Sequence, residues 1–394
     1  MLLTFAKDIM KRVVISGGGL VCGLGNNLQT AWEALTQGAS GVKRFPEASF
    51  REEGVQIAAI PSLDTTKLLE ELTVKSKAAA YGMLAVQEAL ETSQLPMENT
   101  DSTSLLAEIT GQNTHSGNKL SGLKRIFHSF GSQLALNFKV RGRVQTFISP
   151  FGEMNALGEA FNAIKWGEQD RVILVGASPE VDQDLVRSFV NLGFLNTEEN
   201  ARPEAGFQPY GEHAKGTVLG EGAACLVLEE LESAQKRSAP ILAEVVSYAS
   251  SNDAAFLTKP SEEAEGLTRA ITQALERAGL SNVDLVVGEG TSIPERDRAE
   301  LIALRNVFSN AKVTSSKPST GHTLSASSAM QTLFAAKAVS DKAFPILNVN
   351  KPLKIDSKHP VEYLETDQLK PQSVLVTSMG LGGHNSSLIL KMLN

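Results

Sequence analysis

The chain has 394 residues, of which 42% are hydrophobic and 21% are charged, a composition typical of a globular protein. Its net charge of −7 argues against a general nucleic-acid-binding surface, and no apolar run approaches the roughly 20 residues that a membrane-spanning helix needs. The two cysteines, Cys22 and Cys225, are too few for a disulfide framework and have no zinc-site spacing, which favours a reducing, cytoplasmic setting.

Strand-like apolar runs alternate with helical patterns from the start of the chain. The first strand is expected to stop at Gly17, the first of three consecutive glycines. Two later runs are almost continuously apolar, as in strands that are buried on both faces of a sheet. The first half is thus predicted to contain a strand, two helices and two strands, at residues 12–16, 27–37, 74–92, 171–176 and 223–228.

The pattern starts again after Pro240 and echoes the first half. Both halves contain an alanine-rich helix and a late apolar strand that is followed by small residues. Strands that alternate with helices in this way predict βαβ units and layered α/β packing. The predicted elements are strand, helix, strand, helix and strand, at residues 241–248, 262–278, 285–287, 325–340 and 373–377.

The segment 141–160 reads as a strand, a sharp turn and a helix. This arrangement can present a nucleophile at a helix N-terminus, where the helix dipole favours a thiolate. The turn instead holds Pro150, Phe151 and Gly152, none of which can attack a carbonyl. Either the turn is an ordinary one, or a catalytic scaffold has kept its shape and lost its chemistry.

Three further segments contain candidate site residues. Glu289 follows a predicted strand, and α/β proteins usually bind ligands at the carboxyl ends of strands. Lys317 and His322 lie in SKPSTGHT, before a predicted helix, and a glycine-rich turn, MGLGGHN, contains Leu381. Each residue also has a structural interpretation, since Glu289 could pair with a nearby cation and His322 could be a satisfied buried side chain.

Other patterns carry weaker hypotheses. Cys22 and Cys225 are interpreted as buried structural thiols rather than as nucleophiles. The remaining histidines have no metal-ligand spacing, and no metal or cofactor is expected. Gly17, Gly19 and Gly23 loosely match a dinucleotide-binding loop, but no acidic residue ends a second strand about 20 positions later.

Together these segments resemble the β-ketoacyl synthase family over essentially the whole chain. The resemblance depends on LGEGAACLVLEE, SSKPSTGHT and MGLGGHNSS, which are specific as a set. It implies an α/β, thiolase-like fold with two similar halves in a five-layer α-β-α-β-α arrangement and a dimer as the working unit. We place the two ketosynthase-like halves at residues 10–239 and 240–394.

The resemblance also assigns the catalytic positions of condensing members, which use one cysteine and two histidines. The cysteine position falls on Phe151, or on Pro150 when the alignment starts from the following helix. The first histidine is replaced by Glu289, whereas the second is retained as His322 and follows the family lysine, Lys317. Because two of the three positions are lost, condensing activity is not expected.

This departure resembles the chain length factor of type II polyketide and polyene systems. That subunit lacks the cysteine, often has an acidic residue at the first histidine position and pairs with an active ketosynthase. The resemblance implies an active ketosynthase, an acyl carrier protein and the growing chain as partners, and a substrate tunnel at the dimer interface. The tunnel positions are Gly111, Thr114, Asn118 and Leu381, and the small Gly111 and Asn118 predict a long product.

Two departures from that pattern leave alternatives open. Many such subunits have glutamine at the cysteine position and lose the second histidine, whereas this chain does neither. One alternative is a malonyl-carrier-protein decarboxylase in which His322 and backbone donors polarise the thioester. Another is a homodimeric binding protein. The missing glutamine and the missing first histidine argue against the decarboxylase.

Overall fold

The computed structural model describes residues 10–45, 53–74, 76–98, 100–110, 129–343, 362–363 and 369–393. Eleven strands form its main sheet: β1 (Val13–Cys22), β4 (Thr103–Ile109), β5 (Val144–Ile148), β6 (Arg171–Ala177), β7 (Gly222–Glu230), β8 (Ala243–Asn252), β9 (Leu285–Val287), β10 (Lys312–Thr314), β11 (Glu362–Tyr363), β12 (Ser373–Met379) and β13 (His384–Lys391). Their spatial order is β11-β10-β9-β12-β13-β8-β1-β7-β6-β4-β5. β2 (Val42–Arg44) and β3 (Ile57–Ala59) form a separate antiparallel pair.

The strand order repeats between the two ends of the main sheet. The strands of each set can be numbered 1 to 5 along the chain: β1, β4, β5, β6 and β7 in the first set, and β8, β9, β10, β12 and β13 in the second. From the edge of the sheet to its centre, both sets then have the order 3-2-4-5-1, with β11 added at the edge of the second. The parallel and antiparallel pairings also correspond. The two sets meet where β1 pairs antiparallel with β8, with Val13 opposite Val245. The predicted similarity of the halves is therefore present in the topology, and the boundary after residue 239 stays a prediction.

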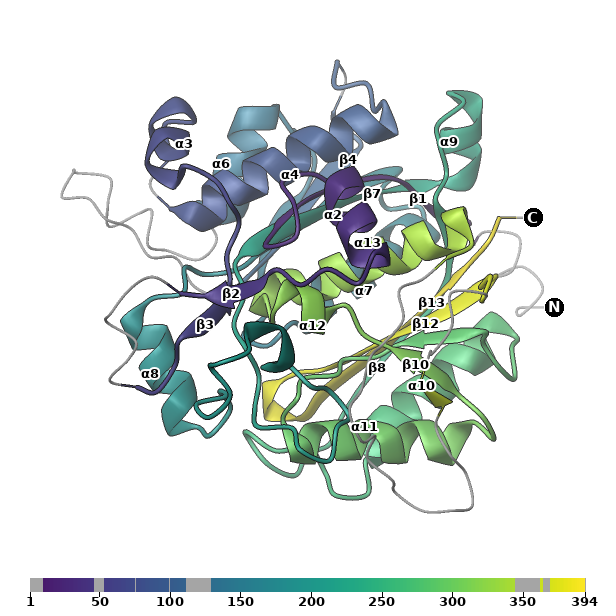
Figure 1. The fold of residues 1–394 in the computed structure, drawn as a ribbon. Coiled ribbons are helices and arrows are strands. Elements are labelled where there is room, and N and C mark those ends of the chain that lie inside the picture. The colour runs from purple at the N-terminus through teal and green to yellow at the C-terminus, as the bar shows by residue number, and fades with distance from the viewer. Residues whose placement is uncertain are drawn as a thin grey trace.

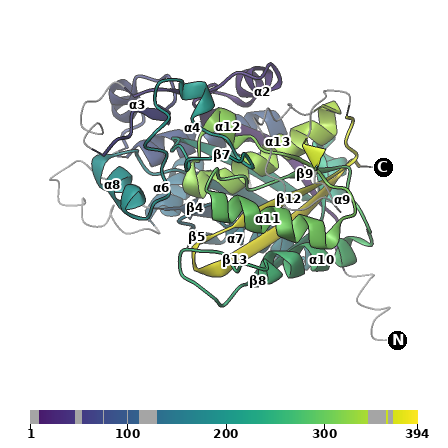
Figure 2. The same cartoon turned by 60° about the horizontal axis from the view of Figure 1, so that its bottom comes forward.

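The helices lie in layers around this sheet (Figures 1 and 2). α7 (Asn155–Lys165) and α13 (Ser327–Asp341) occupy the middle layer and contact strands of both sets. α4 (Lys77–Ser93) and α6 (Ser129–Phe138) cover the outer face of the first set, and α10 (Glu265–Ala278) and α11 (Pro294–Val307) cover that of the second. The remaining helices are α2 (Leu28–Thr36), α3 (Thr65–Glu71), α8 (Gln183–Asn191), α9 (Leu231–Lys236) and α12 (Lys317–Thr320), with short 3-10 turns η2 (Pro203–Ala205), η3 (Leu324–Ala326) and η4 (Leu381–Gly383).

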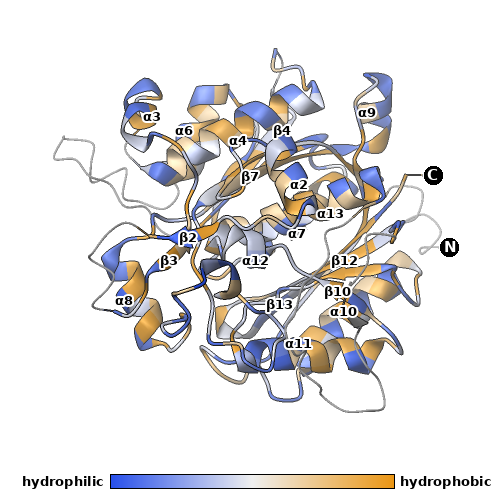
Figure 3. Ribbon diagram, viewed as in Figure 1, coloured by the Kyte–Doolittle hydropathy of each residue, from blue (hydrophilic) through white to orange (hydrophobic). Residues whose placement is uncertain are grey.

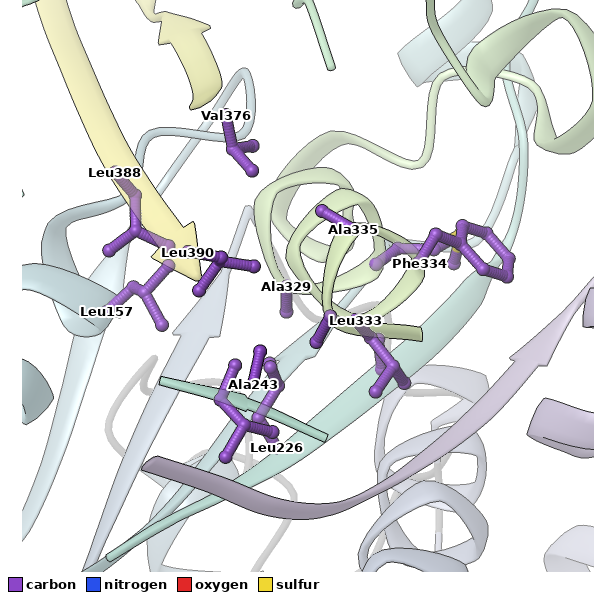
Figure 4. Packing of buried hydrophobic residues seen from close by; sticks show 14 of the residues in the cluster. Leu157, Leu226, Ala243, Ala329, Leu333, Phe334, Ala335, Val376, Leu388 and Leu390 are labelled. Atoms are coloured by element: carbon purple, nitrogen blue, oxygen red, sulfur yellow. The ribbon is translucent and has the colours of Figure 1, made fainter. Parts of the chain in front are cut away.

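The middle layer is the centre of the hydrophobic core. On α13, the small Ala329 and Ala335 are fully buried, which allows strands of both sets to approach the helix. Leu333 and Phe334 fill the remaining space, and Figure 4 shows them among side chains from β7, β8, β12 and β13. Hydrophobic and hydrophilic residues alternate on surface helices such as α8 (Figure 3), as expected for helices with one face toward water. Among the described residues, no helix combines the length and apolarity required to span a bilayer.

The first strand differs from its prediction because β1 continues through the three glycines to Cys22. A Cβ atom on Gly17 would lie 2.5 Å from the backbone nitrogen of Ser93, and one on Gly19 would lie 2.1 Å from the backbone oxygen of Ala85, both on α4. A Cβ atom on Gly18 would lie 2.2 Å from a methyl group of Leu333 on the opposite face. The glycines therefore allow helices to pack closely on both faces of β1 rather than ending the strand.

The other predicted elements are present, with boundaries that local capping explains. α2 begins after Asn27, whose side chain accepts a hydrogen bond from the backbone N–H of Thr30. α4 begins three residues later than expected because Ser76 caps it by accepting from the backbone N–H of Ala79. α10 begins at Glu265 because Ala264, with φ of 52°, is left-handed and cannot belong to the helix.

Candidate functional site

The turn between β5 and α7 directs Phe151 into the interior of the protein. Gly152 has φ of 86°, and a Cβ atom there would lie 3.0 Å from the backbone oxygen of Leu324. The buried carboxylate of Glu153 stabilises the turn, since its Oε2 accepts hydrogen bonds from Ser149 Oγ at 2.9 Å and from the backbone N–H of Phe151 at 3.1 Å. The predicted strand-turn-helix is thus present, and it presents an aromatic ring.

The ring of Phe151 is completely buried among other rings. Its centroid lies 4.4 Å from that of His322, 5.7 Å from that of Phe194 and 6.1 Å from that of Phe189. The guanidinium carbon of Arg296 lies 4.4 Å from the ring centroid. The position at which a nucleophile would stand is therefore filled by packed side chains.

Glu289 lies directly after β9 and forms a buried ion pair. Lys317 Nζ lies 3.1 Å from Glu289 Oε1 and also donates a hydrogen bond to the backbone oxygen of Glu289 at 2.7 Å. The same ammonium donates to Gln331 Oε1 at 2.9 Å, and Gln331 Nε2 donates to the backbone oxygen of Gly288 at 2.6 Å. Lys317 thus connects the loop after β9 to the central helix α13.

Charge determines the protonation state of Glu289. Burial acts to raise the pKa of its carboxyl, but the positive charge of Lys317, together with contributions from His322 and Arg296, outweighs burial and lowers the pKa. We therefore assign Glu289 as an ionised carboxylate at neutral pH. Its charge is balanced locally by Lys317, so the pair is electrically neutral as a unit.

His322 is a neutral, fully buried imidazole. Its Nδ1 accepts a hydrogen bond from the backbone N–H of Leu324 at 3.1 Å and lies 3.3 Å from Ser327 Oγ. The ring proton is therefore on Nε2, which lies 3.5 Å from Glu289 Oε1 and has no hydrogen-bond partner of normal geometry among the described residues. Burial lowers the pKa of His322 to about 4, even though Glu289 favours the charged form.

Two buried carboxylates of α11 stabilise the loop that contains Glu289. Glu300 accepts hydrogen bonds from the backbone N–H groups of Glu289 at 2.8 Å and Gly290 at 3.0 Å. Asp297 accepts from those of Thr291 at 2.7 Å and Ser292 at 3.0 Å. The sequence analysis did not identify this pair. In the sequence, the pair is only two acidic residues three positions apart on one helix, and this spacing usually indicates a solvent-exposed face.

A further buried acidic side chain, Glu108 on β4, links the two central helices. Its Oε1 accepts from the backbone N–H of Ala156 in the first turn of α7 at 2.9 Å, and its Oε2 accepts from Ser328 Oγ in the first turn of α13 at 2.9 Å. Burial raises the pKa of Glu108 to about 8. The sequence analysis missed this residue because it lies within an otherwise apolar strand.

The structure thus brings Phe151, Glu289, Lys317 and His322 into one buried site, and it places Phe151 rather than Pro150 against the histidine. Leu381 lies beside this site, in η4, where its backbone N–H donates to Glu153 Oε1 at 3.1 Å. The other tunnel candidates lie outside the described residues: Gly111, Thr114 and Asn118.

The two thiols lie in strands of the main sheet. Cys22 ends β1 and Cys225 lies within β7, and both are buried and unpaired. Burial raises the pKa of Cys22 to about 11 and raises that of Cys225 further. Both therefore match the structural interpretation, and neither has the lowered pKa of a nucleophilic cysteine.

Comparison with solved structures identifies the fold. The described fold matches the "AntDE:AntF" complex, a type II PKS acyl-carrier protein with its ketosynthase, with a TM-score of 0.87 and 22% identity over 98% of this chain and 100% of that one. It matches the ishigamide ketosynthase/chain length factor with a TM-score of 0.86 and 22% identity, covering 98% and 100%. A β-ketoacyl synthase from Burkholderia phymatum gives 0.85 and 26%, with the same coverage. The predicted α/β, thiolase-like fold is confirmed.

Sequence comparison identifies the family. The β-ketoacyl synthase N-terminal domain matches residues 10–234, and the C-terminal domain of the same family matches residues 242–350. A 3-oxoacyl-[acyl-carrier-protein] synthase 2 from Coxiella burnetii is 30% identical over 413 residues, covering 96% of this chain and 98% of its own. One from Staphylococcus aureus strain COL is 29% identical, covering 97% and 98%. The chain belongs to the β-ketoacyl synthase family.

Proposed function

We propose that this chain is a chain length factor, the non-catalytic subunit that pairs with an active ketosynthase and shapes the acyl tunnel. One observation carries the proposal. The position expected for the attacking sulfur holds Phe151, whose ring is fully buried against His322. A hydrocarbon ring cannot form an acyl thioester, and both thiols of the chain are buried in strands elsewhere.

The charges at the site support the same conclusion. A general acid or base needs a proton that it can exchange with substrate at a pKa near the working pH. Here Glu289 is ionised and paired with Lys317, and His322 is neutral with a strongly lowered pKa. The site is therefore better described as a self-neutralised structural network than as a proton-transfer site.

The names of similar proteins offer two roles, a synthase and a chain length factor. The relatives from Coxiella burnetii and Staphylococcus aureus are named as 3-oxoacyl-[acyl-carrier-protein] synthases, and one structural neighbour contains a ketosynthase/chain length factor. Loss of the cysteine and of the first histidine favours the second role for this chain. An acyl carrier protein, as in another neighbour, would then deliver substrate to the partner subunit.

An edge of the sheet offers a surface for the partner. β5 is the last described strand at its end of the sheet, and Ile148 on it is 55% exposed. α6 packs on β5 and exposes Leu136 at 81%. Exposed apolar residues on a sheet edge promote pairing with another chain, so we assign this edge to the ketosynthase subunit.

In this proposal Gly111, Thr114, Asn118 and Leu381 line the closed end of a tunnel in a cytoplasmic heterodimer. Small side chains at Gly111 and Asn118 leave space for a long polyketide or polyene chain. The test is co-expression with a ketosynthase that has an intact cysteine and two histidines. We expect a stable heterodimer and condensation only by the pair, and Gly111→Phe should shorten the product.

Four results would contradict the proposal. The first is condensation by this chain without a partner. The second is a covalent acyl group on the purified chain after incubation with a loaded carrier protein. The third is release of carbon dioxide from malonyl carrier protein by the isolated chain, which would support the decarboxylase alternative. A stable self-dimer that does not exchange with a ketosynthase would favour a homodimeric binding protein.

A further inference from the structure

We propose that Arg296 is the residue that, together with Phe151, keeps the former reaction chamber closed. This inference rests on the proposed function, because it explains how a non-catalytic subunit excludes acyl groups from its own site. It predicts that a thiol restored at position 151 reacts slowly with a long thioester, and that removal of the Arg296 side chain as well makes this acylation faster.

The position of Arg296 is energetically unfavourable for a cation. It lies in the first turn of α11, where the positive end of the helix dipole repels positive charge. Its side chain is also among the largest that are fully buried in this protein. Burial of a charge without a partner is strongly unfavourable, because the charge loses its hydration and gains nothing in return. A cation at such a position therefore needs specific compensation.

The surroundings of Arg296 supply that compensation. Its guanidinium donates hydrogen bonds to the backbone oxygen of Met379 and, at 3.5 Å, to that of Gly380. The carboxylates of Glu289 and Glu153 oppose the lowering of its pKa by burial. These contacts fix the planar group at the end of β12, opposite the turn that contains Phe151.

The fixed guanidinium then lies over the aromatic ring. Its carbon is 4.4 Å from the Phe151 centroid, within the range of a cation–π interaction. The ring of Phe151 is also packed against Phe189 and Phe194. Arg296 thus covers Phe151 from the α11 side and forms, with it, a two-residue plug.

A thiol at position 151 would experience two separate effects of Arg296. The positive charge would lower the thiol pKa and increase the thiolate fraction. The bulk of the side chain would hinder a long acyl group from reaching the sulfur. The reaction to be measured is attack of the thiolate on the carbonyl of octanoyl-N-acetylcysteamine. A new sulfur–acyl bond forms, the original thioester bond breaks, and N-acetylcysteamine leaves as a thiolate that takes a proton from water.

The experiment compares three forms of the full-length chain, co-expressed with the ketosynthase where solubility requires it. They are Phe151→Cys alone, Phe151→Cys with Arg296→Ala, and Phe151→Cys with Arg296→Met. The methionine variant is the matched control, because it removes the charge and keeps most of the bulk. Rates are measured from pH 6 to 10 with octanoyl-N-acetylcysteamine and with the small probe iodoacetamide. Peptide mass spectrometry reads position 151 separately from Cys22 and Cys225.

We expect the Arg296→Ala form to be acylated at least about tenfold faster per thiolate than Phe151→Cys alone, a difference of about 1.4 kcal/mol in the barrier. The Arg296→Met form should remain within about threefold of Phe151→Cys, since a factor of three is under 1 kcal/mol. Iodoacetamide should react at similar rates per thiolate in all three. A general loss of structure would change the rates of both probes together.

The proposal is overturned if Phe151→Cys alone is acylated as fast as the Arg296→Ala form, or if the Met and Ala forms react equally fast. It is also overturned if no form is acylated. An Arg296→Ser form replaces the alanine form if the latter loses its cooperative thermal transition. A negative result here does not bear on the proposed heterodimer, because pairing and product length are tested with chains that keep Phe151 and Arg296.

Discussion

The carboxylate of Glu289 lies 3.1 Å from the ammonium of Lys317, and both side chains are almost completely inaccessible to water. A buried pair of this kind adds little net stability relative to apolar residues, but loss of one partner leaves an uncompensated charge. Glu289, which we predict to stand at the family's first histidine position, is therefore half of an ion pair on which local folding depends.

Glu289→Gln should destabilise the protein by about 3–5 kcal/mol, because Lys317 would remain buried without a counter-ion. The loss is measured as the midpoint and slope of urea unfolding, on the same oligomeric form as the wild type. Combining Glu289→Gln with Lys317→Met removes both charges and should cost clearly less than the sum of the two single changes. Strictly additive losses would contradict a direct pairing.

Gln331→Glu provides a second test, because Gln331 already accepts a hydrogen bond from Lys317 at 2.9 Å. In the wild type this change adds a second buried carboxylate and should be destabilising. In the Glu289→Gln background it supplies the missing charge, so it should restore at least about half of the lost stability, a coupling of about 1–3 kcal/mol. If Gln331→Glu destabilises both backgrounds equally, a carboxylate at position 331 cannot replace Glu289 as the counter-ion of Lys317.

The lowered pKa of His322 predicts that its contribution to the free energy of unfolding depends on pH. Its folded pKa is about 4, below the ordinary value of 6.5, so the unfolded chain binds the proton first as pH falls. The contribution of neutral His322 is therefore present above pH 6.5 and is lost between about pH 6.5 and 4, at up to about 1.4 kcal/mol per pH unit.

The comparison is between wild type and His322→Gln, with urea unfolding at several pH values from 7.5 to 5. The difference in unfolding free energy between the two proteins should shrink as pH falls through this range. The exposed His384→Gln is the matched control and should leave the wild-type pH dependence unchanged. A pH-independent difference for His322→Gln would mean that burial does not lower the pKa of His322 below its value in the unfolded chain.

The raised pKa of Glu108 predicts the opposite pH dependence of stability. Burial raises its folded pKa to about 8, so its contribution is fully present below the ordinary value of 4.5 and is lost as pH rises through 8. Glu108→Gln keeps an acceptor for the backbone N–H of Ala156, and its amide N–H can donate to Ser328 Oγ in place of the hydrogen bond that Ser328 donates to Glu108. The variant should therefore become more stable relative to wild type as pH rises from 4.5 to 8, and the difference should level off above pH 8.

Thermal unfolding followed by circular dichroism checks this prediction across that pH range. Glu232→Gln, at an exposed position of α9, is the control and should run parallel to wild type. If Glu108→Gln also runs parallel to wild type, then Glu108 has the same protonation in the folded and unfolded chains.

Much of the architecture was predictable from local patterns. The almost continuous apolar runs at 171–176 and 223–228 became β6 and β7, at the positions expected for buried strands. The repeat after Pro240 became a second set of strands with the same order as the first. The interpretation of Gly17 as a strand end was wrong, because glycines inside a strand and glycines after one have the same local pattern, and only the helices packed on β1 distinguish them.

The amino-acid sequence by itself determined that the turn before α7 contains no thiol, since residue identity is a local property. The resemblance to the family then predicted that Phe151 stands at the cysteine position and Glu289 at the first histidine position. Only the folded chain revealed that Arg296 covers Phe151 and that Lys317 neutralises Glu289. These contacts join residues from distant segments, and their energies depend on burial and on the partner charges that surround them. Neither quantity can be read along the chain, since both arise when the sheet and its central helices bring those segments together.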